Sequence, residues 1–124
     1  MPNRMTQINI RANNIELTAP IEEYIYKKAE SFDKYLKEDS AARLSVEVAK
    51  TTMHHKQGDV FRTEFNLAIS GAQLRAEAET GDLYAALDEA KDELLSELRN
   101  HKDKRLTLLK RGHQRIKEFL RRFK

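Results

Sequence analysis

The sequence predicts an α/β fold of the two-layer α+β type, with element order β-α-β-β-β-α and a basic helical tail. Four short segments alternate apolar and polar residues, which is the period of a strand with one buried face. Two longer segments repeat apolar residues at every third or fourth position, as amphipathic helices do. The last twenty or so residues differ in composition and are strongly basic. Because each element has a single apolar face, we expect both helices to pack on one face of a four-stranded sheet.

The first strand and the first helix are the clearest elements of the N-terminal half. The strand is expected over Thr6–Ala12, and the helix over Ala19–Lys37. Thr18 is a suitable N-cap, and Pro20 fits the first helical turn because its missing N–H is not needed there. The apolar stripe of this helix consists of Ile21, Ile25, Ala29, Phe32 and Leu36.

Three further strands follow the first helix. They are expected over Arg43–Lys50, Val60–Ser70 and Gln73–Glu79. The polar segment between the first two of these contains a Gly58-Asp59 turn signal. The helix between the first two strands predicts a right-handed crossover, so those strands should be parallel. The last three strands should form an antiparallel meander.

The second helix is expected from an N-cap at Asp82 to about Lys102. Its apolar stripe consists of Leu83, Leu87, Ala90, Leu94 and Leu98. Gly112 then interrupts the apolar pattern, and His113–Lys124 has the spacing of a separate short basic amphipathic helix. Such a short helix is marginal in water, so we expect it to order against another surface.

Charge divides the chain into a domain over residues 1–104 and a basic amphipathic tail over residues 105–124. The domain carries 15 basic and 19 acidic side chains, a net charge of −4, whereas the tail carries 8 basic side chains and one acidic side chain, a net charge of +7. A basic tail favours a polyanionic partner, nucleic acid first and an anionic membrane surface second. With no cysteine, no signal peptide and no long apolar run, we expect a cytoplasmic protein without disulfides or a thiolate zinc site.

Several short runs stand in an order that is fairly specific as a set. These runs are Gln7–Ile10, Ile15–Thr18, Lys34–Leu36, Ala76–Glu79, Asp82–Asp88, Leu98 and His101–Lys104. Together they resemble the ribosome hibernation-promoting factor family, which includes the ribosome-associated inhibitor and sigma-54 modulation proteins. The resemblance covers about Thr6–Lys104, and it implies the same β-α-β-β-β-α fold.

The resemblance also implies a function. It implies binding to the small ribosomal subunit in the channel of messenger and transfer RNA, which would block initiation and promote ribosome hibernation in stressed or stationary cells. Such a protein needs no catalytic residue, no cofactor and no small-molecule substrate. It resembles the short form of the family, because the residues after the domain are too few for the dimerisation domain of the long form.

Phosphate contacts require cations, so the candidate RNA-binding residues are the basic side chains and histidines of the domain and the first part of the tail. They are Lys28, Lys50, His54, His55, Lys56, Arg62, Arg75, Lys91, Arg99, Lys102, Lys104, Arg105, Lys110 and Arg111. Each could instead be an ordinary solvated surface residue. The adjacent histidines are a weak metal signal, because no third ligand is evident, and we expect no metal site.

Other functions remain as alternatives. The chain could be a general structured-RNA-binding protein, or a protein-interaction or membrane-surface module driven by the tail, although a membrane partner is not expected. The tail could also bind a second copy through Ile116, Phe119, Leu120 and Phe123. An enzyme is not expected, because no phosphate-binding glycine loop, HExxH motif or cysteine nucleophile occurs.

Overall fold

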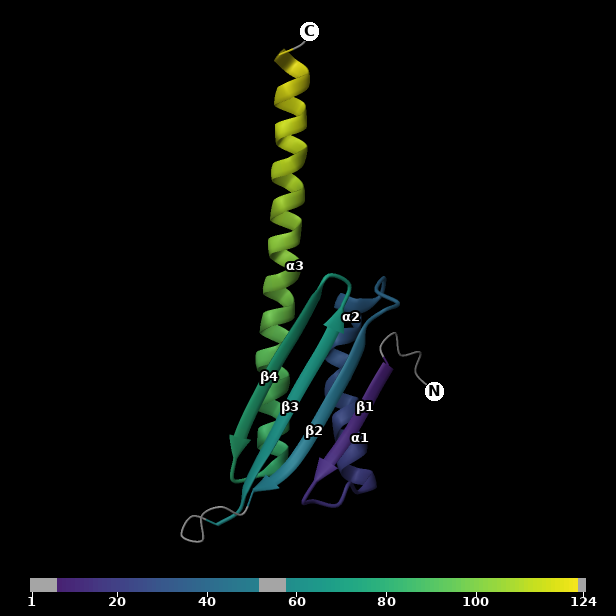
Figure 1. Cartoon of the computed structure of the whole chain (residues 1–124), viewed down its shortest axis with the longest axis vertical. Helices are drawn as coiled ribbons and strands as arrows, with labels where there is room; N and C mark the ends of the chain where they lie inside the picture. The colour runs from purple at the N-terminus through teal and green to yellow at the C-terminus, as the bar shows by residue number, and fades with distance from the viewer. Residues whose placement is uncertain (1–6, 52–57, 123–124) are drawn as a thin grey trace.

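The computed structural model describes residues 7–51 and 58–122 and confirms the predicted fold class. Figure 1 shows the elements in chain order. The strands are β1 (Gln7–Asn13), β2 (Arg43–Thr51), β3 (Val60–Ile69) and β4 (Ala72–Thr80). The helices are α1 (Ala19–Ala29), the short 3-10 turn η1 (Glu30–Phe32), α2 (Asp33–Leu36) and α3 (Leu83–Arg122).

The four strands lie in the order β1-β2-β3-β4 within one sheet. β1 and β2 are parallel, and the other neighbouring pairs are antiparallel, as the crossover argument predicts. The register aligns Val46 of β2 with Ile10 on one side and Phe65 on the other. Apolar residues of neighbouring strands therefore face the same side of the sheet.

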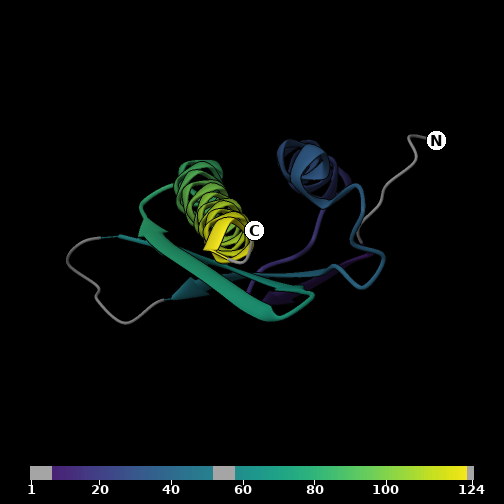
Figure 2. The same ribbon diagram turned by 90° about the horizontal axis from the view of Figure 1, so that it is seen from above.

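The helices α1, α2 and α3 cover this one side of the sheet and leave the other side open (Figure 2). The strand directions imply that α1 and α3 are parallel to each other. Two hydrogen bonds agree with this orientation. The Tyr24 hydroxyl donates to Asp88 at 2.6 Å and Arg99 Nε donates to the Tyr35 hydroxyl at 2.8 Å, and each pair is separated by 64 residues. The C-terminal ends of both helices therefore lie at the same end of the domain.

The core lies between the sheet and the helices, and both predicted helical stripes are buried in it. The rings of Phe32 and Phe65 meet edge to face, with centroids 6.3 Å apart. The first helix is less regular than predicted, because η1 interrupts it. There the Ser31 hydroxyl donates to the Lys28 carbonyl at 2.7 Å, a local bond that competes with regular helical bonding.

The long helix α3 begins as predicted and ends differently. The Ala85 amide donates to the Asp82 carboxylate at 3.0 Å, which confirms the predicted N-cap. The predicted interruption at Gly112 is wrong, because α3 is one helix of 40 residues that passes through this glycine. A glycine costs a helix only about 1 kcal/mol relative to alanine, and most of the residues around Gly112 are good helix formers. The helix therefore extends past the end of the sheet (Figure 1).

Candidate nucleic-acid interface

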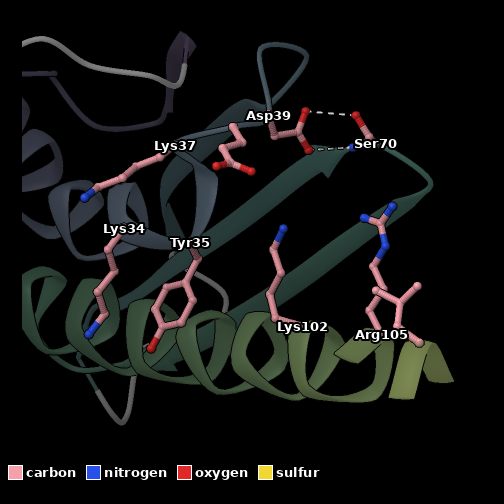
Figure 3. Close-up of a pocket in the computed structure, with 9 residues that line it drawn as sticks. Lys34, Tyr35, Lys37, Asp39, Ser70, Lys102 and Arg105 are labelled. Carbon is pink, nitrogen blue, oxygen red and sulfur yellow. Dashed lines mark hydrogen bonds between the residues drawn. The ribbon is translucent and has the colours of Figure 1, made fainter. Parts of the chain in front are cut away.

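A basic groove lies at the end of the domain where α2 stops and α3 continues outward (Figure 3). Lys34 and Lys37 come from the end of α2 and the residue after it, and Lys102 and Arg105 come from α3. The groove has a volume of about 560 Å³. Its lining residues are Lys34, Tyr35, Lys37, Glu38, Asp39, Ser70, Lys102, Arg105 and Leu109. Within the described parts of the chain, the four basic side chains of this lining form no ion pair.

Asp39, one of the acidic residues of the lining, joins two segments of the groove wall by hydrogen bonds. Its carboxylate accepts hydrogen bonds from the Ser70 amide at 2.8 Å, the Ser70 hydroxyl at 2.9 Å and the Ala41 amide at 3.1 Å. These bonds, led by the one from the Ser70 amide, lower the pKa of Asp39, and the positive charge of Lys102 adds to the effect. Asp39 thus ties the β3–β4 turn to the segment after α2, which fixes one wall of the groove.

The aromatic ring of Tyr35 is held among cations. Arg99 donates to its hydroxyl, and this hydrogen bond is the main cause of the lowered pKa of Tyr35. The Lys34 ammonium lies 5.1 Å from the centroid of the same ring, within the range of a cation–π contact. The end of α2 and the adjoining turns of α3 are therefore joined by polar contacts, and these contacts position Arg99 beside the groove.

The groove contains both predicted and unpredicted residues. Lys102 and Arg105 were candidates from the sequence, and the structure places both in the lining, with Arg99 close by. Lys34 and Lys37 were not candidates. The signal that could have found them is the parallel orientation of the two helices, which follows from the element order and brings both basic helix ends together.

Two other candidates, Arg62 and Arg75, lie on the open face of the sheet and are already paired with carboxylates. Arg62 contacts Glu64 and Glu77, each at 2.7 Å, and Glu47 at 3.8 Å. Arg75 contacts Glu64 at 3.1 Å and Glu77 at 2.8 Å. With two arginines among three glutamates, the cluster has no surplus positive charge to offer a phosphate.

This cluster predicts a specific pH dependence of stability. Hydrogen bonds from Asn66, Arg75 and Arg62 lower the pKa of Glu64 from 4.5 to about 2. The folded protein stabilises the ionised carboxylate of Glu64 more than the unfolded chain does. This stabilisation is therefore fully present above pH 4.5 and is lost as the pH falls toward about 2. We expect the free energy of unfolding to fall more steeply over this range in the wild type than in Glu64→Gln. Urea unfolding at a series of pH values tests this, and parallel curves for the two proteins would contradict it.

Three more candidate lysines also form ion pairs. Lys28 contacts Asp88 at 3.0 Å, Lys50 contacts Asp59 at 3.2 Å and Lys91 contacts Asp92 at 2.5 Å. The side chain of Lys91 is only 17% exposed, so it presents little surface to a partner. Their roles in RNA binding stay predictions.

The remaining candidates fall into two groups. Lys104, Lys110 and Arg111 are exposed on the outward part of α3, beyond the sheet. His54, His55 and Lys56 lie outside the described residues. Within the described ranges, no helix is long and apolar enough to cross a membrane, and no group of three or more histidine, aspartate or glutamate side chains is placed to hold a metal ion.

Comparison with known proteins identifies the family of this domain. Residues 8–106 match the model of the family described as "Sigma 54 modulation protein / S30EA ribosomal protein". The chain belongs to this family. The match runs from β1 into α3 and includes nearly all of the groove-lining residues. It ends before the outer part of α3.

Several relatives of the S30EA family cover this same domain. The chain is 31% identical to the ribosome hibernation promoting factor of Escherichia coli over 98 residues. This aligned region covers 79% of this chain and 95% of the relative. It is 29% identical over 103 residues to that of Pseudomonas putida, covering 83% and 93%. It is 32% identical to the ribosome hibernation promotion factor of Deinococcus radiodurans over 93 residues, 75% of this chain but only 47% of that protein.

Two solved structures share the fold. The N-terminal domain of Protein Y from Thermus thermophilus has a TM-score of 0.64 and 28% identity, covering 77% of this chain and 98% of that structure. A ribosomal subunit interface protein from Coxiella burnetii has a TM-score of 0.65 and 18% identity, covering 78% and 98%. At that identity the second likeness concerns the fold alone.

Proposed function

We propose that this protein binds the small ribosomal subunit, occupies the channel of messenger and transfer RNA, and keeps ribosomes inactive under stress or in stationary phase. The observation that carries the proposal is the basic groove within the family domain, which gathers Lys34, Lys37, Lys102 and Arg105 at one end, with Arg99 beside it. The names of the relatives, ribosome hibernation promoting factors, support the same function.

The groove suits folded RNA for a physical reason. Structured RNA is recognised largely through its shape and its phosphates, and each phosphate contact needs a cation that is not already neutralised. The groove supplies such cations, whereas the arginines of the sheet face are paired with glutamates. Binding of this kind blocks a channel by occupying it, so the protein acts without catalysis and without a cofactor, in the cytoplasm where ribosomes are found.

Co-sedimentation with ribosomes and separated subunits tests the proposal. We expect saturable one-to-one binding to the small subunit, and we expect messenger RNA together with initiator transfer RNA to displace the protein. An unrelated folded RNA of similar size serves as the specificity control. Equal affinity for that RNA would instead indicate a general structured-RNA-binding protein. Binding that is indifferent to the channel ligands would contradict occupation of the channel.

A further inference from the structure

The outer part of α3, residues 105–122, carries a ridge of exposed apolar side chains. We call this segment the extension. Its ridge consists of Leu106, Leu108, Leu109, Ile116, Phe119 and Leu120, which are 56–65% exposed. Large apolar side chains gathered on one surface of a soluble protein usually mark a contact site. The extension lies almost wholly beyond the part of the chain that matches the family, so the family match does not account for the ridge.

The centre of the ridge, at Leu109 and Ile116, faces the same side as the buried stripe of α3, and Leu106 and Leu108 lie about 80° to either side of it. Leu109 lies about three helical turns beyond the buried Leu98, and Ile116 lies about two turns further, so all three share one side of the helix. Leu109 also lines the basic groove. The outer part of α3 extends past the end of the sheet (Figure 1), and Leu109 joins the ridge to the groove, so we call the combined surface the corner. With a rise of about 1.5 Å per residue, the extension is about 27 Å long.

Cations border the ridge on both sides. Arg115 and Lys117 are the immediate neighbours of Ile116, so they lie about 100° to either side of it. Arg122 and Lys110 repeat these two positions about two turns away. Glu118 is the one acidic residue of the extension, and it lies on the far side from the ridge. The occupant of this surface must therefore offer an apolar strip with anionic borders.

Three kinds of occupant fit this surface poorly. RNA would satisfy the cations but would leave the leucine ridge uncovered. A second copy of the extension would bring basic borders against basic borders, which is destabilising. A flat anionic membrane lying along α3 would meet the sheet before it reached the ridge, because Leu109 and Ile116 share the side of α3 on which the buried Leu98 lies in the core.

We propose that the corner formed by the extension and the basic groove is a docking site for an acidic amphipathic helix of another protein. An apolar stripe on that helix covers the ridge, in the manner of helix-in-groove recognition. Its bordering carboxylates meet Arg115 and Lys117, and one end approaches Lys102 and Arg105 in the groove. The carboxylates of the partner helix attract the basic borders of the ridge, whereas the basic borders of a second copy would repel them. This difference selects the acidic partner. The proposal does not rest on ribosome binding, although both use Lys102 and Arg105 of the groove.

A synthetic peptide of about six helical turns tests this site on the full-length protein. The probe carries leucine at the core positions of a heptad and glutamate at the bordering positions, and a matched peptide carries lysine in place of glutamate. Fluorescence anisotropy should show saturable binding of the acidic peptide and at least about tenfold weaker binding of the basic one. Equal binding of both peptides, or no binding of the acidic one, would overturn the proposal.

Variants of the extension locate the contact. Ile116→Gln with Leu120→Gln removes part of the ridge, and Arg115→Gln with Lys117→Gln removes two border charges. Each pair should weaken binding of the acidic peptide by about tenfold or more. The control is Arg121→Gln, set against Arg115→Gln alone, because each removes one charge and Arg121 lies about one and a half turns from Ile116 on the far side of the helix. This control should bind nearly as the wild type does.

Circular dichroism and sedimentation equilibrium complete the test. Helix content should be the same in all variants, so that lost binding reports lost contacts. If the wild type sediments with the mass of two chains and does not bind the peptide, a second copy occupies the ridge. That result would overturn the proposal. So would binding to anionic vesicles that competes with the peptide. Ribosome co-sedimentation, measured in parallel, keeps failure of this proposal distinct from failure of the proposed function.

Discussion

Reversing the charge of two groove residues, in Lys102→Glu with Arg105→Glu, is expected to lower affinity for the small ribosomal subunit by about 100-fold. A hydrogen bond to a charged group contributes about 1.5–3 kcal/mol, so losing two of them costs about 3 kcal/mol or more, or about 100-fold in affinity. Lys102 and Arg105 line the groove without an ion pair to any described residue, and the one further effect of Lys102 is that its charge helps to lower the pKa of Asp39. Co-sedimentation with purified small subunits measures the change.

The charge-matched control is Arg11→Glu with Lys27→Glu. Both side chains are exposed, on β1 and α1, and they lie outside the groove. A long-range effect of net charge would weaken this control as much as the groove variant, whereas the groove contacts predict a much smaller loss. Salt gives a second criterion. Each phosphate contact contributes about 0.7–0.9 to the slope of log affinity against log salt, so the groove variant should show a slope that is shallower by about 1.5. An unchanged slope would exclude phosphate contacts at these residues.

The fold could be predicted because its information is local. Each strand and helix has a single apolar face that can be read from a short window, and packing both helices on one face of a single sheet buries all these faces together. The buried Leu83, Leu87, Leu94 and Leu98 of α3 are those that the spacing indicates. The N-cap at Asp82 is equally local, since it depends on a hydrogen bond to an amide three residues away.

The groove was only half predicted because its information is not local. Lys34 and Lys102 are far apart in the sequence, and they become neighbours through the parallel orientation of two helices. The ion pairs of the sheet face pose the same difficulty. Arg62 is a candidate phosphate ligand by residue type, and the register of β3 with its neighbours brings Glu47 and Glu77 beside it. Cross-strand register, and not the residue type, decides whether an arginine is available.

The extension was predicted wrongly for a different reason. Gly112 breaks the apolar pattern, and a broken pattern looks like the end of a helix. Hydrophobic period reports burial, however, and helical geometry can continue where nothing is buried. Because most residues after Gly112 are good helix formers, the cost of one glycine is offset and α3 continues to Arg122. A pattern that depends on packing cannot mark the end of a helix that extends away from the domain.

Leucine-to-alanine substitutions within α3 should separate the part of the helix that holds the fold from the part that is available to a partner. Leu94 is 0% exposed in the core, and Leu108 is 65% exposed on the extension. We expect Leu94→Ala to lower the free energy of unfolding by about 2–5 kcal/mol, through lost burial and the cavity left behind. We expect Leu108→Ala to change it by about 0.5 kcal/mol or less. Urea unfolding, followed by circular dichroism, measures both.

Leu94→Ala and Leu108→Ala are matched in the type of substitution and in the helix that carries it. Both changes replace leucine by alanine in the same helix, so the small gain in helix propensity is common to both. A loss of about 2–5 kcal/mol is a large share of the about 5–15 kcal/mol that holds a small domain together, so Leu94→Ala should unfold at much lower urea. If Leu108→Ala were equally destabilising, the ridge would be packed within the protein or between copies, and no apolar surface would remain for a partner. A neutral Leu108→Ala beside a destabilised Leu94→Ala would instead show that Leu108 contributes little to folding and that its exposed side chain is available to a partner.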